Sequence, residues 1–136
     1  MKEEVASKYG TDDHEVTRKM AEELGVDARI IFLVKNMGNI YALSEPANSG
    51  DWELKIATYA DCRVAPNGIV GAKERLDDLI ARNAGRPIEA VYRAIPPLVL
   101  ELEEQVFANA LIRPQDVSDK TVAPYILKYK QRIRSR

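Results

Sequence analysis

Asp61, in the stretch KIATYADCRV at residues 55–64, is the residue whose type and position most suggest chemistry. If this stretch is helical, spacings of three, four and three residues place Asp61 on a largely apolar face. Its neighbours on that face are Leu54, Ala57 and Val64. A carboxylate at or near the core is costly unless it is paired. The pattern leaves three roles open, which are a structural carboxylate, a metal ligand and a general acid or base with a raised pKa.

The histidine and cysteine content limits the chemistry that one copy of the chain can assemble. His14 is the single histidine, so a metal site with two or more histidine ligands cannot be built within one copy. His14 falls in the first turn of a predicted helix, where a solvent-facing or capping role competes with a role as a metal ligand. Cys62 is the single cysteine and has no histidine near it in sequence, so we interpret it as a small hydrophobic residue.

Other charged side chains are expected to support the fold. Asp77 and Asp78 are adjacent, so on a helix their carboxylates point about 100° apart and do not form an acid pair. We expect Asp78 to pair with Arg63 or Arg75. A second acidic group, Glu101, Glu103 and Glu104, is expected on a solvated face. The basic C-terminal residues are explained by the macrodipole of a last helix.

Capping residues and helical periodicity predict an all-α fold, an irregular array of six to seven helices in one domain over residues 1–136. The expected helices lie between Asp12 and Gly25, at about 28–37, at about 52–64, between Ala72 and Gly85, from Pro87 to a break at Pro96-Pro97, at about 97–110 and at 120–134. Residues 1–10 are either extended or a short helix. The apolar run at 30–34 also fits a buried strand, and residues 41–50 are expected to form a loop.

The helical patterns also predict which side chains face the core. These are Val16, Met20, Leu24, Trp52, Leu76, Leu79, Ile80, Leu98, Leu102, Val106, Phe107, Val122, Tyr125, Ile126, Tyr129 and Ile133.

Composition argues against several classes of partner. The net charge of −1 predicts no strong attraction to nucleic acid or to an anionic membrane. No apolar run approaches the roughly 18 residues of a membrane span, and the charged N-terminus does not resemble a signal peptide. With one free cysteine, we expect a soluble cytoplasmic protein.

The stretch KIATYADCRVAPNGIVGAKERLDDLIAR resembles the closing segment of the HD-domain superfamily of metal-dependent phosphohydrolases. The matching residues are Tyr59, Ala60, Asp61, Arg63 and Val64, then Gly68, Ile69, Val70, Glu74, Arg75, Leu76, Asp78 and Leu79. Weaker similarity extends over residues 12–40 and 101–117, so that the resemblance covers about 11–118.

The resemblance implies a metal-binding role for Asp61, which matches the last aspartate ligand of the family. His14 matches an auxiliary histidine of two-metal members, and Asn36 stands where a second auxiliary histidine would be. Tyr59, Arg63, Arg75 and Asp78 would support the site. The family's first histidine and its His-Asp doublet have no counterpart here. Two ligands do not hold a catalytic divalent ion, for which three protein ligands are the usual minimum.

Two functional hypotheses follow. In the first, the chain is a truncated or degenerate HD-like domain with no cofactor, which acts by self-association or partner binding. The helices absent from it would leave the apolar faces of 28–37 and 52–64 exposed, so we expect a homo-oligomer, most simply a dimer. In the second, it is a phosphohydrolase that uses Mn, Fe, Ni, Zn or Mg on a nucleotide or other phosphate ester. An upstream segment or another chain would then supply the missing ligands.

Overall fold

The computed structural model describes residues 2–37 and 44–134, without the side chains of residues 2, 13, 14 and 132–134. Its elements are α1 (Lys2–Tyr9), α2 (Asp13–Glu23), α3 (Ala28–Asn36), α4 (Ser44–Asn48), α5 (Trp52–Asp61), β1 (Val64–Ala65), β2 (Gly68–Ile69), α6 (Ala72–Arg82), α7 (Glu89–Ala94), α8 (Pro96–Phe107), the 3-10 turn η1 (Pro114–Asp116) and α9 (Asp119–Arg134). The prediction of an all-α fold is confirmed. The described residues form nine α-helices rather than the six to seven expected, and one hairpin with two residues in each strand.

Three helices begin at the caps that the sequence predicts. The Asp12 carboxylate accepts from the Glu15 amide at 2.9 Å, Asp27 from Arg29 at 2.8 Å, and Asp51 from Leu54 at 3.1 Å. Each bond satisfies an amide that the first turn of a helix leaves without a backbone partner. Local sequence therefore fixes the start of α2, α3 and α5.

Several element boundaries differ from those expected. The loop expected at 41–50 contains the short helix α4, and residues 41–43 lie outside the described part. The helix expected at 52–64 ends at Asp61, because the next residues enter the β1–β2 hairpin, in which Val64 pairs with Ile69. The break at Pro96 is confirmed, with Pro96 as the first residue of α8.

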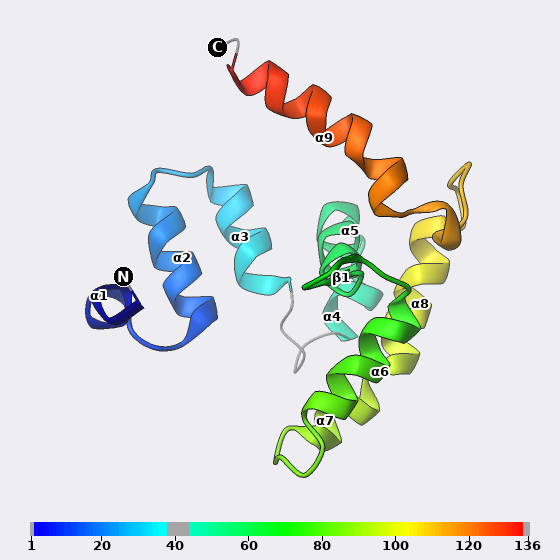
Figure 1. Ribbon diagram of the computed structural model, residues 1–136, viewed down its shortest axis with the longest axis horizontal. Helices are drawn as coiled ribbons and strands as arrows, with labels where there is room; N and C mark the ends of the chain where they lie inside the picture. The colour runs from blue at the N-terminus through cyan, green and yellow to red at the C-terminus, as the bar shows by residue number, and fades with distance from the viewer. Residues whose placement is uncertain (1, 38–43, 135–136) are drawn as a thin grey trace.

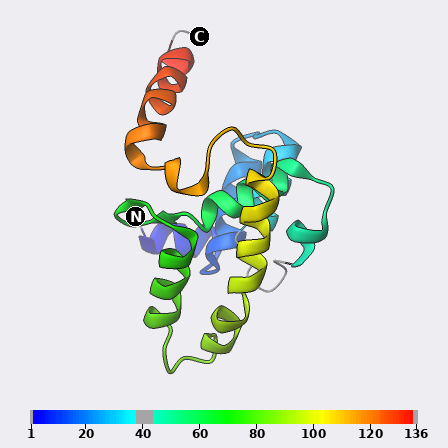
Figure 2. The same cartoon turned by 90° about the vertical axis from the view of Figure 1, so that its right-hand side faces the viewer.

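The helices form an open arrangement rather than a closed bundle. α1 packs on α2, α2 on α3 and α3 on α5, which then packs on α8 (Figure 1). α6 runs beside α8, and α7 packs on α6 and leads into the start of α8, while α9 projects from the body in both views (Figures 1 and 2).

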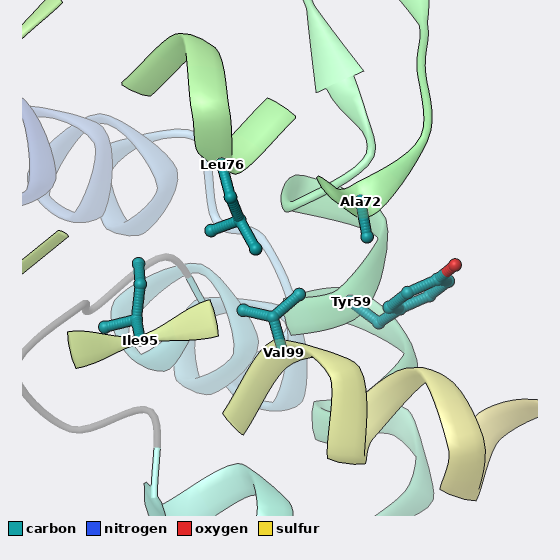
Figure 3. Packing of buried hydrophobic residues seen from close by; sticks show 5 residues of the cluster. All are labelled: Tyr59, Ala72, Leu76, Ile95 and Val99. Carbon is teal, nitrogen blue, oxygen red and sulfur yellow. The ribbon is translucent and has the colours of Figure 1, made fainter. Parts of the chain in front are cut away.

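The core lies where α5, α6 and α8 meet. It contains Tyr59, Ala72, Leu76, Ile95 and Val99 (Figure 3). Leu102 is fully buried as predicted, whereas Val99, also fully buried, is absent from the predicted set.

The buried face of α5 differs from the predicted one. Its buried residues are Leu54, Lys55, Thr58 and Tyr59, whereas Asp61 and Trp52 are exposed. The inward placement predicted for Asp61 and Trp52 is therefore wrong. The pattern misled because lysine and tyrosine bury their apolar stems while their polar tips find partners.

The predicted inward face of α9 is also wrong. Tyr125, Ile126 and Tyr129 are exposed, and the Ile133 side chain lies outside the described part. Met20 of α2 and Leu24, the residue after α2, are likewise exposed. Periodicity identified the apolar stripes correctly, but the single chain does not cover them.

Candidate functional site

Arg63 makes more hydrogen bonds than any other described charged side chain of residues 55–82. Its exposed fraction is 5%, although its guanidinium carries a charge. Nε donates to the Val70 carbonyl, and Nη2 donates to the carbonyls of Pro114 and Val117, each at 3.1 Å. Nη1 donates to the Tyr59 hydroxyl at 2.5 Å. A planar guanidinium can satisfy several carbonyls at once, so Arg63 ties α5 to the hairpin and to η1.

Tyr59 and Glu103 complete this buried network. The Tyr59 hydroxyl donates to the Glu103 carboxylate at 2.5 Å, and that carboxylate lies 3.9 Å from Nη1 of Arg63. Burial, together with the hydrogen bond to Glu103, raises the pKa of Tyr59 to about 12, although Arg63 opposes the shift. Tyr59 is therefore neutral at ordinary pH and acts as a hydrogen-bond relay between an arginine and a carboxylate.

Glu103 accepts the hydrogen bond from Tyr59, a role that the sequence did not predict. We expected it on a solvated face with its acidic neighbours, but its side chain is only 23% exposed. The signal was available, since Glu103 follows the buried Val99 by four residues and precedes Phe107 by four. That spacing places it on the core face of α8.

Asp61 lies outside the Arg63 network. It is the last residue of α5 and is exposed, and within the described part of the chain its carboxylate makes no hydrogen bond or ion pair. Burial raises the pKa of the neighbouring Cys62 thiol to about 11, and the charge of Asp61 adds to that shift. A solvated carboxylate needs no partner, so the question of what neutralises a buried Asp61 does not arise.

The predicted pairing of Asp78 is confirmed with Arg75 and not with Arg63. Asp78 Oδ2 accepts from Arg75 Nη1 at 3.3 Å and from Arg82 Nη2, all three residues being on α6. These residues line an open cleft of about 430 Å³ beside the hairpin. Arg75 Nε is buried there without a hydrogen-bond partner.

Of the two predicted metal ligands, the structure describes the side chain of Asp61 but not that of His14. His14 belongs to α2, but its side chain lies outside the described part. Asn36, at the end of α3, donates its amide to the Phe32 carbonyl at 2.6 Å. Among the side chains that the structure does describe, no group of three or more histidine, cysteine, aspartate or glutamate residues is placed to hold a metal ion.

Lys55 is a second buried charge that the sequence reading did not single out. Its ammonium donates to the Ala47 carbonyl at 3.0 Å and to Gln105, and it lies 5.2 Å from the centre of the Trp52 ring. These contacts join α4, α5 and α8. Lys55 therefore holds the first half of α5 against α4 and α8. Arg63 holds the end of α5 against the hairpin and η1.

A further cleft of about 480 Å³ opens beside Arg63, between the hairpin, the start of α6 and α8. Leu100, Glu103 and Val117 contribute to its walls. Every nitrogen of the Arg63 side chain already donates within the protein. The guanidinium therefore acts as a structural tie rather than as an anion receptor.

Exposed apolar side chains form the other notable feature of the molecule. On α3 and α5, which pack together, the exposed large apolar residues are Ile30 (50%), Phe32 (42%), Trp52 (49%) and Ile56 (52%). Trp52 and Ile56 share one face of α5, whereas Ile30 and Phe32, two residues apart, lie on different sides of α3. We call these four residues together the α3–α5 surface. The prediction that apolar side chains of these two helices are exposed is confirmed for these four residues but not for Leu54 and Tyr59, which are buried, and the predicted burial of the run at 30–34 is wrong.

α9 carries a second exposed apolar set. Tyr125 (75%), Ile126 (47%) and Tyr129 (65%) follow the half-buried Val122 at helical spacing and form the α9 stripe. Leu127 is also exposed but lies on the opposite side of the helix, since it is five residues from Val122.

The base of α9 is attached to the rest of the fold. The Asp119 carboxylate accepts from the Ile69 amide at 3.1 Å, and Arg63 holds the carbonyls of Pro114 and Val117 just before it. Gly68 has a φ of +122°, and a β-carbon there would collide with the Asp119 carboxylate. The hairpin and Arg63 together therefore set the direction in which α9 leaves the body.

No helix of the described residues is long and apolar enough to cross a membrane. Comparisons with protein-family models, with curated proteins and with solved structures found no match to this chain.

Proposed function

We propose that this chain is a helical association module, a degenerate HD-like domain that acts by binding a second copy of itself. The observation that carries the proposal is the exposure of large apolar side chains on α3 and α5, which pack on each other, and on α9, which projects from the body (Figure 1). Apolar side chains at helical spacing are normally covered in a folded protein, and several that stay exposed often mark an interaction site.

The total surface supports the same proposal. The chain exposes 9807 Å², whereas a compact monomer of 15.3 kDa exposes about 7,100 Å². The excess is roughly 2,700 Å², and a stable dimer of standard size removes about 800 Å² from each partner. The chain therefore has enough uncovered surface for a substantial interface.

The buried charges fit a structural role in this proposal. Arg63 and Lys55 direct their donors to carbonyls, a hydroxyl and an amide oxygen of the same chain. These contacts hold α5, the hairpin and the base of α9 in place. They keep the apolar surfaces of the module in a fixed arrangement.

Sedimentation velocity over roughly 1–100 µM protein, where interfaces of modest affinity dissociate, tests the proposal. We expect a reversible shift from one to two copies within that range. A single species of 15.3 kDa at every concentration would contradict it.

Metal analysis provides the second arm of the test. Stoichiometric Mn, Fe, Ni, Zn or Mg in the purified chain, together with hydrolysis of a phosphate ester that Asp61→Ala abolishes, would support the metal-dependent phosphohydrolase instead. An Asp77→Ala variant is the matched control, because Asp77 is also an exposed helical aspartate.

A further inference from the structure

We infer that the two exposed apolar sets are the two halves of one interface, so that the α9 stripe of one copy covers the α3–α5 surface of a second copy, and reciprocally. This inference rests on the proposed self-association and specifies its geometry. Because each copy carries both halves, a two-fold arrangement makes the same contact twice and closes as a dimer.

α9 does not cover the α3–α5 surface within one copy. Both sets of side chains remain exposed in the single chain, and α9 projects from the body (Figures 1 and 2). Asp119 and the turn before it fix the base of α9 on the hairpin. A second copy can supply the missing cover without any change in that anchored base.

Size and shape also match. A helix of 16 residues such as α9 is about 24 Å long, enough to span two packed helices. The stripe residues recur at positions three, four and seven from Val122, as in a helix that docks one face into an apolar groove. Two such contacts would cover part of the roughly 2,700 Å² of excess exposed surface.

Charge complements the apolar match. Residues 119–136 carry six basic side chains and one acidic one, whereas residues 1–61 carry twelve acidic and seven basic ones. Exposed acids lie near these residues in sequence at Asp27, Asp61 and Glu53, of which Glu53 already pairs with Arg29 at 2.7 Å. Opposite charges around an apolar centre guide association and specify its register. Repulsion between two basic helices disfavours the competing arrangement in which α9 pairs with α9.

Charge-insertion variants with matched controls test the inference. Tyr129→Glu alters the α9 stripe, and Leu127→Glu places the same charge on the opposite side of α9. Ile56→Glu alters the α3–α5 surface. Leu100→Glu is its control, because it places the same charge at an exposed position of α8 outside that surface. We expect the first member of each pair to raise the dimer Kd by about 30-fold or more, as loss of one hot spot does, and the controls to change it little.

Mixing the two defective variants is the decisive experiment. In a homodimer of either variant both contacts are damaged, whereas a heterodimer of Tyr129→Glu with Ile56→Glu retains one intact contact. The mixture should therefore associate more tightly than either variant alone, as measured by sedimentation with one partner fluorescently labelled. Circular dichroism of each variant checks that the monomer is folded.

The outcomes separate this inference from the proposed function. If the wild-type chain is a monomer throughout, both fail. If the wild-type chain dimerises, and Tyr129→Glu weakens dimerisation while Ile56→Glu does not, α9 pairs with α9 and this inference is overturned. Dimerisation that neither variant affects, or a mixture no tighter than the separate variants, also overturns it while leaving self-association in place.

Discussion

The buried guanidinium of Arg63 provides the sharpest test of how this fold is held together. Replacing Arg63 by methionine keeps much of the side-chain volume but removes the donors to Tyr59, Val70, Pro114 and Val117. A buried acceptor without a donor costs about 1–3 kcal/mol, and breaking one side of a buried charged network costs about 3–5 kcal/mol. Because the adjoining cleft lets water reach some of the carbonyls, we expect a loss of about 3 kcal/mol in the free energy of unfolding.

Urea unfolding followed by circular dichroism measures this loss. With a dependence of about 1–3 kcal/mol per molar urea, the midpoint should fall by about 1–3 M. All variants are compared at one protein concentration, because association adds to apparent stability. Arg82→Met is the matched control, since Arg82 is half exposed and pairs with Asp78 alone, and its loss should be within about 1 kcal/mol.

The Arg63→Lys variant separates charge from geometry. An ammonium keeps the charge but does not reproduce the planar fork, so we expect it to recover only part of the loss. Hydrogen exchange should also speed up in residues 113–122, because Arg63 holds the carbonyls of Pro114 and Val117. An Arg63→Met variant that unfolds within about 1 kcal/mol of the wild type would refute the reasoning, since the network would then contribute no more than a surface pair.

Four other measurements follow from the structure. Leu102→Ala should lower the free energy of unfolding by about 2–5 kcal/mol in the same urea assay, because Leu102 is fully buried; an effect as small as that of a surface substitution would contradict its place in the core. Burial raises the pKa of the Cys62 thiol from 9.0 to about 11, so the thiol should react with a disulfide reagent far more slowly in the folded chain than in urea. Because its pKa is raised in the folded chain, the thiol contributes its full stabilisation below pH 9.0 and loses it as the pH rises towards about 11. Thermal melts across that range should therefore show the difference in Tm between wild type and Cys62→Ala becoming smaller. Gly68→Ala should destabilise the chain by about 1–3 kcal/mol, because a β-carbon at φ +122° meets the Asp119 carboxylate, whereas Gly50→Ala, with open space around it, should be nearly neutral.

Local signals in the sequence predicted the helices well. Asp12, Asp27 and Asp51 each bond to amides of the helix that follows them, and Pro96 begins α8. These features depend on neighbours within a few residues, so they are visible in the sequence. The pairing of Asp78 with Arg75 was predictable for the same reason, since both lie on one helix.

Contacts between distant residues were not predictable in the same way. Arg63 bonds to Pro114 and Val117, about fifty residues away, and Tyr59 bonds to Glu103. Asp61 stood out because it interrupts an apolar pattern, yet it is exposed, while the buried charge is its near neighbour Arg63. A pattern identifies the stripe of a helix but does not say how far the helix is rotated against its partners.

The sequence by itself determined the all-α class, the helix starts and the apolar character of α3, α5 and α9, because these depend on residue type and local spacing. Only the tertiary structure decided which of those apolar faces is covered. α8 lies over α5 and leaves Trp52 and Ile56 exposed, and α9 projects with Tyr125 and Tyr129 uncovered. Burial is a property of how helices meet, and that meeting is set by long-range contacts such as those of Arg63 and Lys55.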